Sequence, residues 1–187
     1  MKVLEKTEFG NPVLRQKARQ LAKGEILAGE AKALITDLRH TLMMKKYGIG
    51  LAAPQVGQSV ALSVICIRPT KTRPNLPKSK WAELVIINPK IIKTYGRKKQ
   101  MWEGCISLSD VFAKVPRYKK IQLEYLDESG VKRVKTFEGL LAHVIQHEVD
   151  HLHGILFPDI VTQPRTYMSG PEYRKRIVPS IPDDQIE

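Results

Sequence analysis

The segment His147–Glu148–Val149–Asp150–His151 constrains this chain more than any other feature, because it is a metal-binding pattern that works only on a helix. Residues four apart share one face of a helix, so the imidazoles of His147 and His151 can reach one ion. Glu148 follows the first histidine and can handle a water bound to that ion. The helix itself is predicted over about 139–152, where no proline occurs and an apolar stripe is formed by Leu140, Leu141, Val144 and Ile145.

A catalytic metal site needs a third protein ligand and an open position. The pattern that continues to a third histidine fails, because Phe157 stands at that position. A downstream glutamate could be only Glu172 or Glu187, and Glu172 has no helical pattern around it. Upstream, Cys105 lies beside a glycine between strand-like runs and would supply a soft thiolate. On the residues alone both choices stay open, with Cys105 slightly favoured over Glu172.

Length and composition are those of an ordinary globular protein. The 187 residues are 42% hydrophobic and 27% charged, which excludes collagen-like, disordered and membrane-spanning classes. No apolar run approaches the roughly 18 residues of a spanning helix, and the start lacks the apolar segment of a secretory signal. With only two cysteines, Cys66 and Cys105, a disulfide framework is excluded and a reducing compartment is expected. We expect one domain over 1–187, with its core at about 9–160 and an irregular basic tail at 161–187.

The charge is strongly unbalanced. Lys and Arg number 31 against 19 Asp and Glu, so the formal net charge is +12. Such a surface favours polyanionic partners, although it can equally serve solubility alone. The prediction is a weak, salt-sensitive association with the ribosome through the basic stretches 68–80 and 174–176, with no membrane partner and no specific DNA.

Hydrophobic periodicity and turn signals predict the remaining elements. An amphipathic helix is expected over 31–45, and the proline- and lysine-rich segment 68–80 is expected to be a mobile surface loop. Strands are expected at 60–67, 84–87, 91–95, 120–126 and 131–137, the last two joined by the hairpin signal Asp127–Glu128–Ser129–Gly130. This order predicts an α+β fold of mostly antiparallel strands packed around a central helix that carries the His147–His151 motif.

Three blocks of the chain resemble the peptide deformylase family. In order, they are Gly48–Ile49–Gly50–Leu51–Ala52–Ala53–Pro54–Gln55, Glu103–Gly104–Cys105–Ile106–Ser107 and Gln146–His147–Glu148–Val149–Asp150–His151–Leu152–His153–Gly154. The opening Gly10–Asn11–Pro12–Val13–Leu14–Arg15 is also similar to the start of that family. The resemblance covers about residues 9–160, and three separately spaced motifs make it specific.

The resemblance implies a metal-dependent hydrolase that removes the N-terminal formyl group from formyl-methionyl nascent polypeptides and releases formate. One divalent ion is implied, with Fe²⁺ expected and Zn²⁺, Ni²⁺ or Co²⁺ as substitutes. Such an ion polarises the formyl oxygen and lowers the pKa of its water. Carried over residue by residue, Glu148 is the general base and then the acid, and the ligands are Cys105, His147 and His151.

The same resemblance assigns the groups that would hold the substrate. Gln55 and the backbone N–H of Ile106 are implied to form the oxyanion site. Gly50 is implied to pair its backbone with the peptide as an added strand, because glycine lets another chain approach closely. The full set of expected substrate contacts is Ile49, Gly50, Leu51, Leu140, His143 and Val144.

Three positions depart from the usual family pattern. Ser109 stands where bacterial members often carry proline, and Phe112 where they carry an arginine thought to hold the substrate backbone. His143 replaces an aliphatic residue of the pocket for the first side chain. It could be a pocket wall, a hydrogen-bond donor behind the ligands, or an extra metal contact. Arg117 matches a recurring family arginine and is expected either to pair with Glu103 or to be solvated.

These departures leave open a deformylase-like metallohydrolase with altered substrate preference. A basic ribosome-binding module that retains the fold is a further alternative, but it would be favoured only by degenerate metal ligands, and all three are intact. Residues 164–176 resemble the tails of organelle-type members. Yet only nine residues precede Gly10, which leaves no room for a transit peptide, so a bacterial-type cytoplasmic location is expected.

Overall fold

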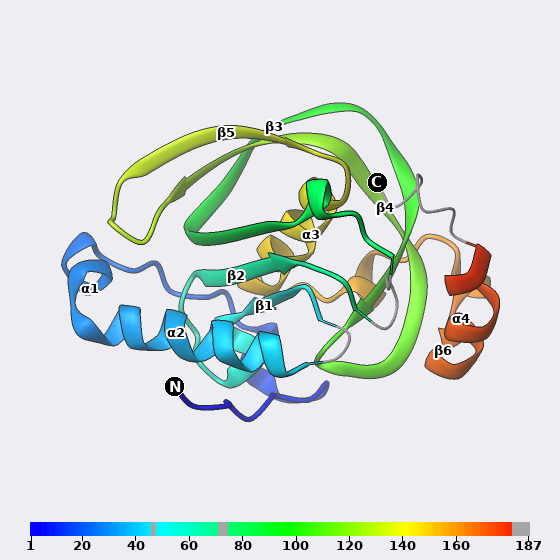
Figure 1. Ribbon diagram of the computed structural model, residues 1–187, viewed down its shortest axis with the longest axis horizontal. Coiled ribbons are helices and arrows are strands. Elements are labelled where there is room, and N and C mark those ends of the chain that lie inside the picture. Colours follow the sequence, from blue (N-terminus) through cyan, green and yellow to red (C-terminus); the bar gives the residue numbers. More distant parts are fainter. Residues whose placement is uncertain (46–47, 71–74, 181–187) are drawn as a thin grey trace.

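The computed structural model describes residues 1–45, 48–70 and 75–180. Short 3₁₀ turns and loops connect the helices and strands drawn in Figure 1. In chain order these are α1 (Lys23–Leu27), α2 (Gly29–Met44), β1 (Gly50–Ala52), β2 (Leu62–Ile67), β3 (Ala82–Cys105), β4 (Leu108–Leu126), β5 (Lys132–Glu138), α3 (Gly139–Leu152), β6 (Met168–Ser169) and α4 (Gly170–Arg176).

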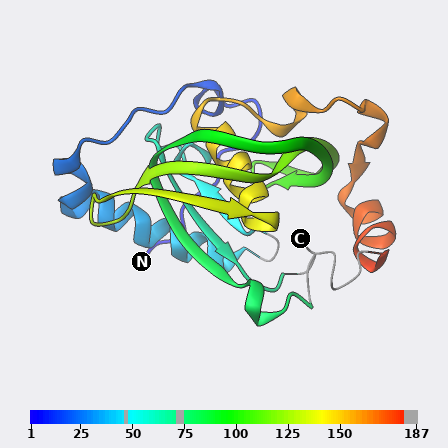
Figure 2. The same ribbon diagram turned by 90° about the horizontal axis from the view of Figure 1, so that it is seen from above.

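The strands form one antiparallel sheet in the order β1-β2-β3-β4-β5, and β6 pairs with the start of β4. The long strands β3 and β4 have 24 and 19 residues, and register shifts interrupt their pairing at four places. Such irregularities bend and twist a ribbon, and the β3-β4 ribbon curves past α3 in both views (Figures 1 and 2). The predicted α+β class with antiparallel strands is confirmed.

Alternation along β2 places apolar side chains on both faces of the sheet. On one face, Ile65 and Ile67 pack with the apolar side of α3, which also contacts β1, β4 and β5. On the other face, Leu62 and Val64 pack with Ile35, Leu38 and Leu42 of α2. Each fully buried aliphatic side chain contributes roughly 1.5–3 kcal/mol, so this packing anchors α3 and leaves its polar side for the functional site.

Two local predictions agree closely with the structure. The predicted helix over 31–45 is α2, and the predicted helix over 139–152 is α3. The hairpin is also confirmed, with Leu126 paired to Lys132 across the turn. The Asp127 carboxylate closes that turn by accepting the backbone N–H groups of Ser129 and Val131.

Other predictions were incomplete. The strands expected at 84–87 and 91–95 are parts of one strand that continues to Cys105. Residues 96–100 are exposed and polar, so no apolar alternation marked this continuation. Glu172, expected to lack a helix, lies within α4. In the proposed loop, 71–74 lie outside the described residues, while Lys78–Lys80 forms a 3₁₀ turn.

Up to residue 180 the tail, which was expected to be irregular, contains 3₁₀ turns, the two-residue strand β6 and the helix α4. None of the helices in the described ranges combines the length and apolar character needed to cross a membrane.

Candidate active site

Three predicted ligands meet beside α3. Cys105 ends β3, while His147 and His151 lie one turn apart on α3. One ligand atom from each side chain lies within 4.8 Å of the other two. Cys105 Sγ is 3.2 Å from His151 Nε2. The sheet and the helix thus bring Cys105 together with two donors of α3 that are far from it in the sequence.

The alternative third ligands lie elsewhere. Phe157, which stands where the extended pattern needs a third histidine, has no ligand atom and is buried with Leu14 and Leu156. Glu172 forms an ion pair with Arg176 on α4. Glu187 lies outside the described residues. Of the candidates that the structure describes, only Cys105 joins the two histidines.

The charges around the cluster fit a bound cation. Burial opposes a charge on His147, yet its hydrogen bonds and charge interactions with Cys105 and Glu103 outweigh burial and raise the pKa of His147 well above its ordinary value. Burial, together with the positive charge on His147, holds the pKa of His151 well below its ordinary value. The site therefore attracts one positive charge, which a metal ion can supply in place of a proton. One thiolate and two imidazoles are ligands that Zn²⁺ and Fe²⁺ accept.

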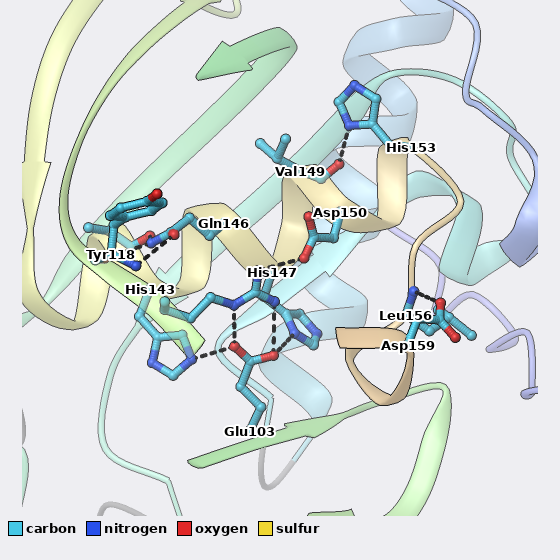
Figure 3. A network of polar contacts seen from close by, with 12 residues as sticks. Glu103, Tyr118, His143, Gln146, His147, Val149, Asp150, His153, Leu156 and Asp159 are labelled. Carbon is cyan, nitrogen blue, oxygen red and sulfur yellow. Dashed lines mark hydrogen bonds and ion pairs between the residues drawn. The ribbon is translucent and has the colours of Figure 1, made fainter. Parts of the chain in front are cut away.

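Glu103 orients this cluster from behind (Figure 3). Its Oε2 is 2.9 Å from His147 Nδ1, so the other ring nitrogen is left for an ion. Arg117 donates to both carboxylate oxygens, at 2.6 and 3.1 Å, and also pairs with Asp150. Burial opposes ionisation of Glu103, but Arg117 and His143 outweigh it and hold the pKa of Glu103 well below its usual range. Of the two alternatives left open for Arg117, the structure thus has the pair with Glu103.

His143 is the third partner of Glu103. Its Nε2 lies 2.7 Å from Glu103 Oε1, and its side chain is 6% exposed. Among the described residues the ligand cluster holds Cys105, His147 and His151 without it. Of the three roles left open by the sequence, the structure thus gives His143 the contact behind the ligands, and His143 is also among the residues that line the cleft.

Glu148 is buried next to the ligands. Burial raises its pKa to about 7, although His147 acts in the opposite direction. Its Oε2 has no hydrogen-bond partner among the described residues, so this oxygen can accept a proton from a group entering the cleft. A Cβ at Gly50 would lie 2.2 Å from Glu148 Oε1. Glycine at this position therefore makes room for the carboxylate.

Gln55 points its amide group into the same site. It lies in the 3₁₀ helix Ala53–Val56, and its Oε1 accepts the backbone N–H of Ala52 at 2.8 Å. That bond leaves the Nε2 group to donate to Cys105 Sγ and Ser107 Oγ, each at 3.4 Å. Gln55 is 1% exposed, so its donor is held in a fixed direction.

Most of these groups line one cleft of about 320 Å³. The predicted contacts that line it are Ile49, Gly50, Gln55, Cys105, Ile106, Leu140, His143, Val144, His147 and Glu148. Leu51 is the exception: its side chain is fully buried in the cluster with α2, on the opposite side of β1. His151 is 1% exposed and adjoins the cleft through Cys105 and His147 of the ligand cluster.

The sequence did not reveal one side of the cleft. Trp102, Phe112, Tyr173 and Arg174 also line it, and the last two come from α4. Phe112 was marked only as a departure from a family pattern. No periodicity or motif connects residues 173 and 174 with Cys105, since the contact depends on how the tail folds back.

Two histidine ligands one turn apart on a helix, in an H-E-x-x-H motif, are accompanied here by its buried glutamate. This combination defines a class of metal-dependent hydrolases. Comparison with known proteins gives the particular family. The profile of the polypeptide deformylase family matches residues 3–166. The chain belongs to this family.

Its relatives include "Peptide deformylase 2" of Nostoc sp., which is 36% identical over 170 residues and is matched over 91% of this chain and 92% of its own length. The peptide deformylase of Picosynechococcus sp. is 43% identical over 159 residues, covering 84% and 79% of the two chains.

Solved structures agree with these relatives. A class I type b peptide deformylase from Acinetobacter baumannii with Met-Ala-Ser bound superposes with a TM-score of 0.80 at 30% identity, over 86% of this chain and 99% of that one. The peptide deformylase of Synechococcus elongatus in complex with actinonin gives a TM-score of 0.75 at 39% identity, over 87% and 81%.

Proposed function

We propose that this protein removes the N-terminal formyl group from formyl-methionyl nascent polypeptides and releases formate. The observation that carries the proposal is the meeting of Cys105, His147 and His151 beside Glu148 in one cleft of a deformylase-family fold. The test is turnover of formyl-Met peptides by anaerobically prepared iron protein, measured as formate released. Absence of formate from fully metal-loaded protein would overturn the proposal.

In this mechanism Cys105, His147 and His151 hold the metal ion. When bound, that ion polarises the formyl carbonyl and lowers the pKa of a water. Glu148 accepts the proton of the attacking water at its unpartnered oxygen and later gives it to the leaving amine. Gln55 Nε2 and the backbone N–H of Ile106 donate to the developing oxyanion.

The substrate backbone is proposed to pair with β1. This strand lies at one end of the sheet order, so no strand of the described residues pairs with its outer side, where we place the added peptide strand. Gly50 brings that edge next to Glu148. Ile49, Leu140 and Val144 then supply an apolar pocket for the methionine side chain, while Leu51 contributes through its backbone.

Replacing Gln55 with alanine is expected to lower kcat about 10²–10³-fold, because the oxyanion loses a fixed donor. KM should change much less, since this contact strengthens in the transition state. Steady-state kinetics on formyl-Met-Ala-Ser measure both constants. Gln58→Ala is the matched control, because Gln58 is exposed in the adjoining turn. Equal kinetic constants for Gln55→Ala and Gln58→Ala would remove Gln55 from the oxyanion site.

Replacing His143 with isoleucine is expected to raise the preference for formyl-Met over formyl-peptides with a polar first side chain, by roughly three- to tenfold. The reason is that an apolar wall replaces a polar ring edge in the pocket. The measurement is the ratio of kcat/KM for the two substrates. His143→Gln, which keeps a donor toward Glu103, is the comparison. An unchanged ratio in both variants would restrict His143 to its contact with Glu103.

The proposed physiological metal is Fe²⁺, with Zn²⁺, Ni²⁺ or Co²⁺ able to replace it. The soft thiolate of Cys105 and two imidazoles are compatible with each of these ions, so the donor set supports the group of metals more than one member. The proposal is tested by metal analysis of protein purified without oxygen from its native host. Stoichiometric zinc with no iron in such a sample would overturn it.

We also propose weak ribosome association through the basic surface. Exposed Lys and Arg side chains occur at Lys78 and Lys80, at Lys175, and along β3 at Arg97–Lys99. Two residues of the basic stretch 174–176 form ion pairs within the protein: Arg174 pairs with Asp110, and Arg176 pairs with Glu172. Cosedimentation with ribosomes should fall as salt rises, and charge reversal of Lys98 and Lys99 should weaken it. Binding that is indifferent to salt would reject the proposal.

Two further expectations from the sequence remain proposals. The chain is proposed to form one domain over 1–187, and to act in the cytoplasm of a bacterial-type cell. The bacterial origin of its relatives supports the second.

A further inference from the structure

The segment after the matched family region builds part of the cleft. The family profile ends at residue 166, and β6 and α4 follow it directly. Met168 and Ser169 pair with Phe112 and Val111, which attaches this segment to the start of β4 (Figure 1). From there α4 directs Tyr173 toward the cleft that also contains the ligand cluster.

Three aromatic rings from three elements pack together on this side, and we call them the aromatic wall: Trp102 of β3, Phe112 of β4 and Tyr173 of α4. The rings of Phe112 and Tyr173 are stacked, with centroids 4.0 Å apart and planes 2° apart. Trp102 meets Tyr173 edge-on, with centroids 5.5 Å apart. All three side chains line the cleft.

The aromatic wall reaches close to the reacting groups. A Cβ at Gly104 would lie 2.5 Å from a ring atom of Phe112, so the ring sits directly on the backbone next to Cys105. Tyr173 is only 3% exposed, so its ring supports the partly exposed rings of Trp102 and Phe112 from behind, and these two rings present the surface to the cleft. A rigid aromatic surface costs little conformational entropy when it binds an apolar group.

We propose that the aromatic wall is a subsite for an apolar, preferably aromatic, side chain that follows the formyl-methionine of the substrate. This inference rests on the proposed function. With the formyl group at the ligand cluster and the methionine in the pocket of Leu140 and Val144, the rest of the peptide continues along the same cleft. Stacking against the wall then favours a phenylalanine over a serine at the next positions.

The test compares kcat/KM for formyl-Met-Phe-Ser and formyl-Met-Ser-Phe with that for formyl-Met-Ser-Ser. Calorimetry on the deformylated peptides gives the corresponding ratios of dissociation constants, which report binding without any turnover. We expect the better phenylalanine peptide to be favoured about three- to tenfold. Tyr173→Ala should bring the ratio close to one, and Tyr173→Phe should restore it. Lys175→Ala, an exposed change on the same helix, is the control.

Trp102→Leu provides a second test that leaves α4 unaltered, and it should lower the same ratio. A wild-type ratio near one in both measurements overturns the proposal. It is also overturned if Tyr173→Ala and Trp102→Leu weaken all three peptides by one common factor, because the rings then only support the fold. If calorimetry shows the binding preference but no formate is released, the proposed deformylase activity is rejected and the proposed subsite is supported.

Discussion

Replacing Cys105 with alanine is expected to remove most of the bound metal. The side chain supplies one of three protein donors, and its Sγ lies 3.2 Å from His151 Nε2. Loss of a partner behind a ligand typically costs 10- to 100-fold in metal affinity, so loss of the ligand itself should exceed about 100-fold. Metal content after dialysis and competition with a chromogenic chelator measure the effect.

Cys66→Ala is the matched control for this experiment. Cys66 is the other cysteine of the chain; its sulfur lies near the sulfur of Met43, away from the ligand cluster. It should retain the metal at the level of the unaltered protein. If Cys105→Ala keeps its metal while Glu172→Ala loses it, the third ligand is the glutamate and the proposed centre is wrong.

Replacing Glu148 with alanine is expected to lower kcat by about 10²–10⁴-fold while the metal stays bound. Without the carboxylate, the proton of the attacking water has no acceptor at the buried position next to His147. The three donors themselves are untouched, so metal content should equal that of the unaltered protein. Single-turnover formate release and metal analysis on one preparation separate the two effects.

Two variants make the result specific to the carboxylate. Glu148→Gln keeps the volume and removes the base, and should be as inactive as the alanine variant. Glu138→Gln changes an exposed glutamate immediately before α3 and should remain active. Activity of Glu148→Ala within about tenfold of the unaltered protein would exclude Glu148 as the base.

Local patterns allowed α2, α3 and the hairpin to be predicted. The stripe of Ile35, Leu38 and Leu42 has the helical period, and the turn at Asp127 closes with its own side chain. These features depend on residues close in sequence, and their physics is complete within a few turns of backbone. The continuation of β3 was missed because its exposed polar residues are held by pairing with β4 rather than by burial.

The candidate site likewise combines residues that local patterns predict with a residue that local patterns do not identify. The spacing of His147 and His151 already defines two ligands on one helical face. By contrast, the residue pattern alone left Cys105 and Glu172 nearly equal, and only the family resemblance separated them before the structure did. Cys105 and His151 are 46 positions apart in the chain, and no local periodicity reports a contact over that separation.

What the sequence by itself determined is the chemistry of the reacting groups: a helix with two histidines and a glutamate, and three motifs of one family. The tertiary structure alone decided which further groups surround them. It brings His143 and Arg117 into contact with Glu103. It also leaves room for the Glu148 carboxylate beside Gly50, and it places Tyr173 among the residues that line the cleft. The reason is physical: these contacts arise from how the curved β3-β4 ribbon packs on α3 and α4, and such packing depends on many distant side chains together.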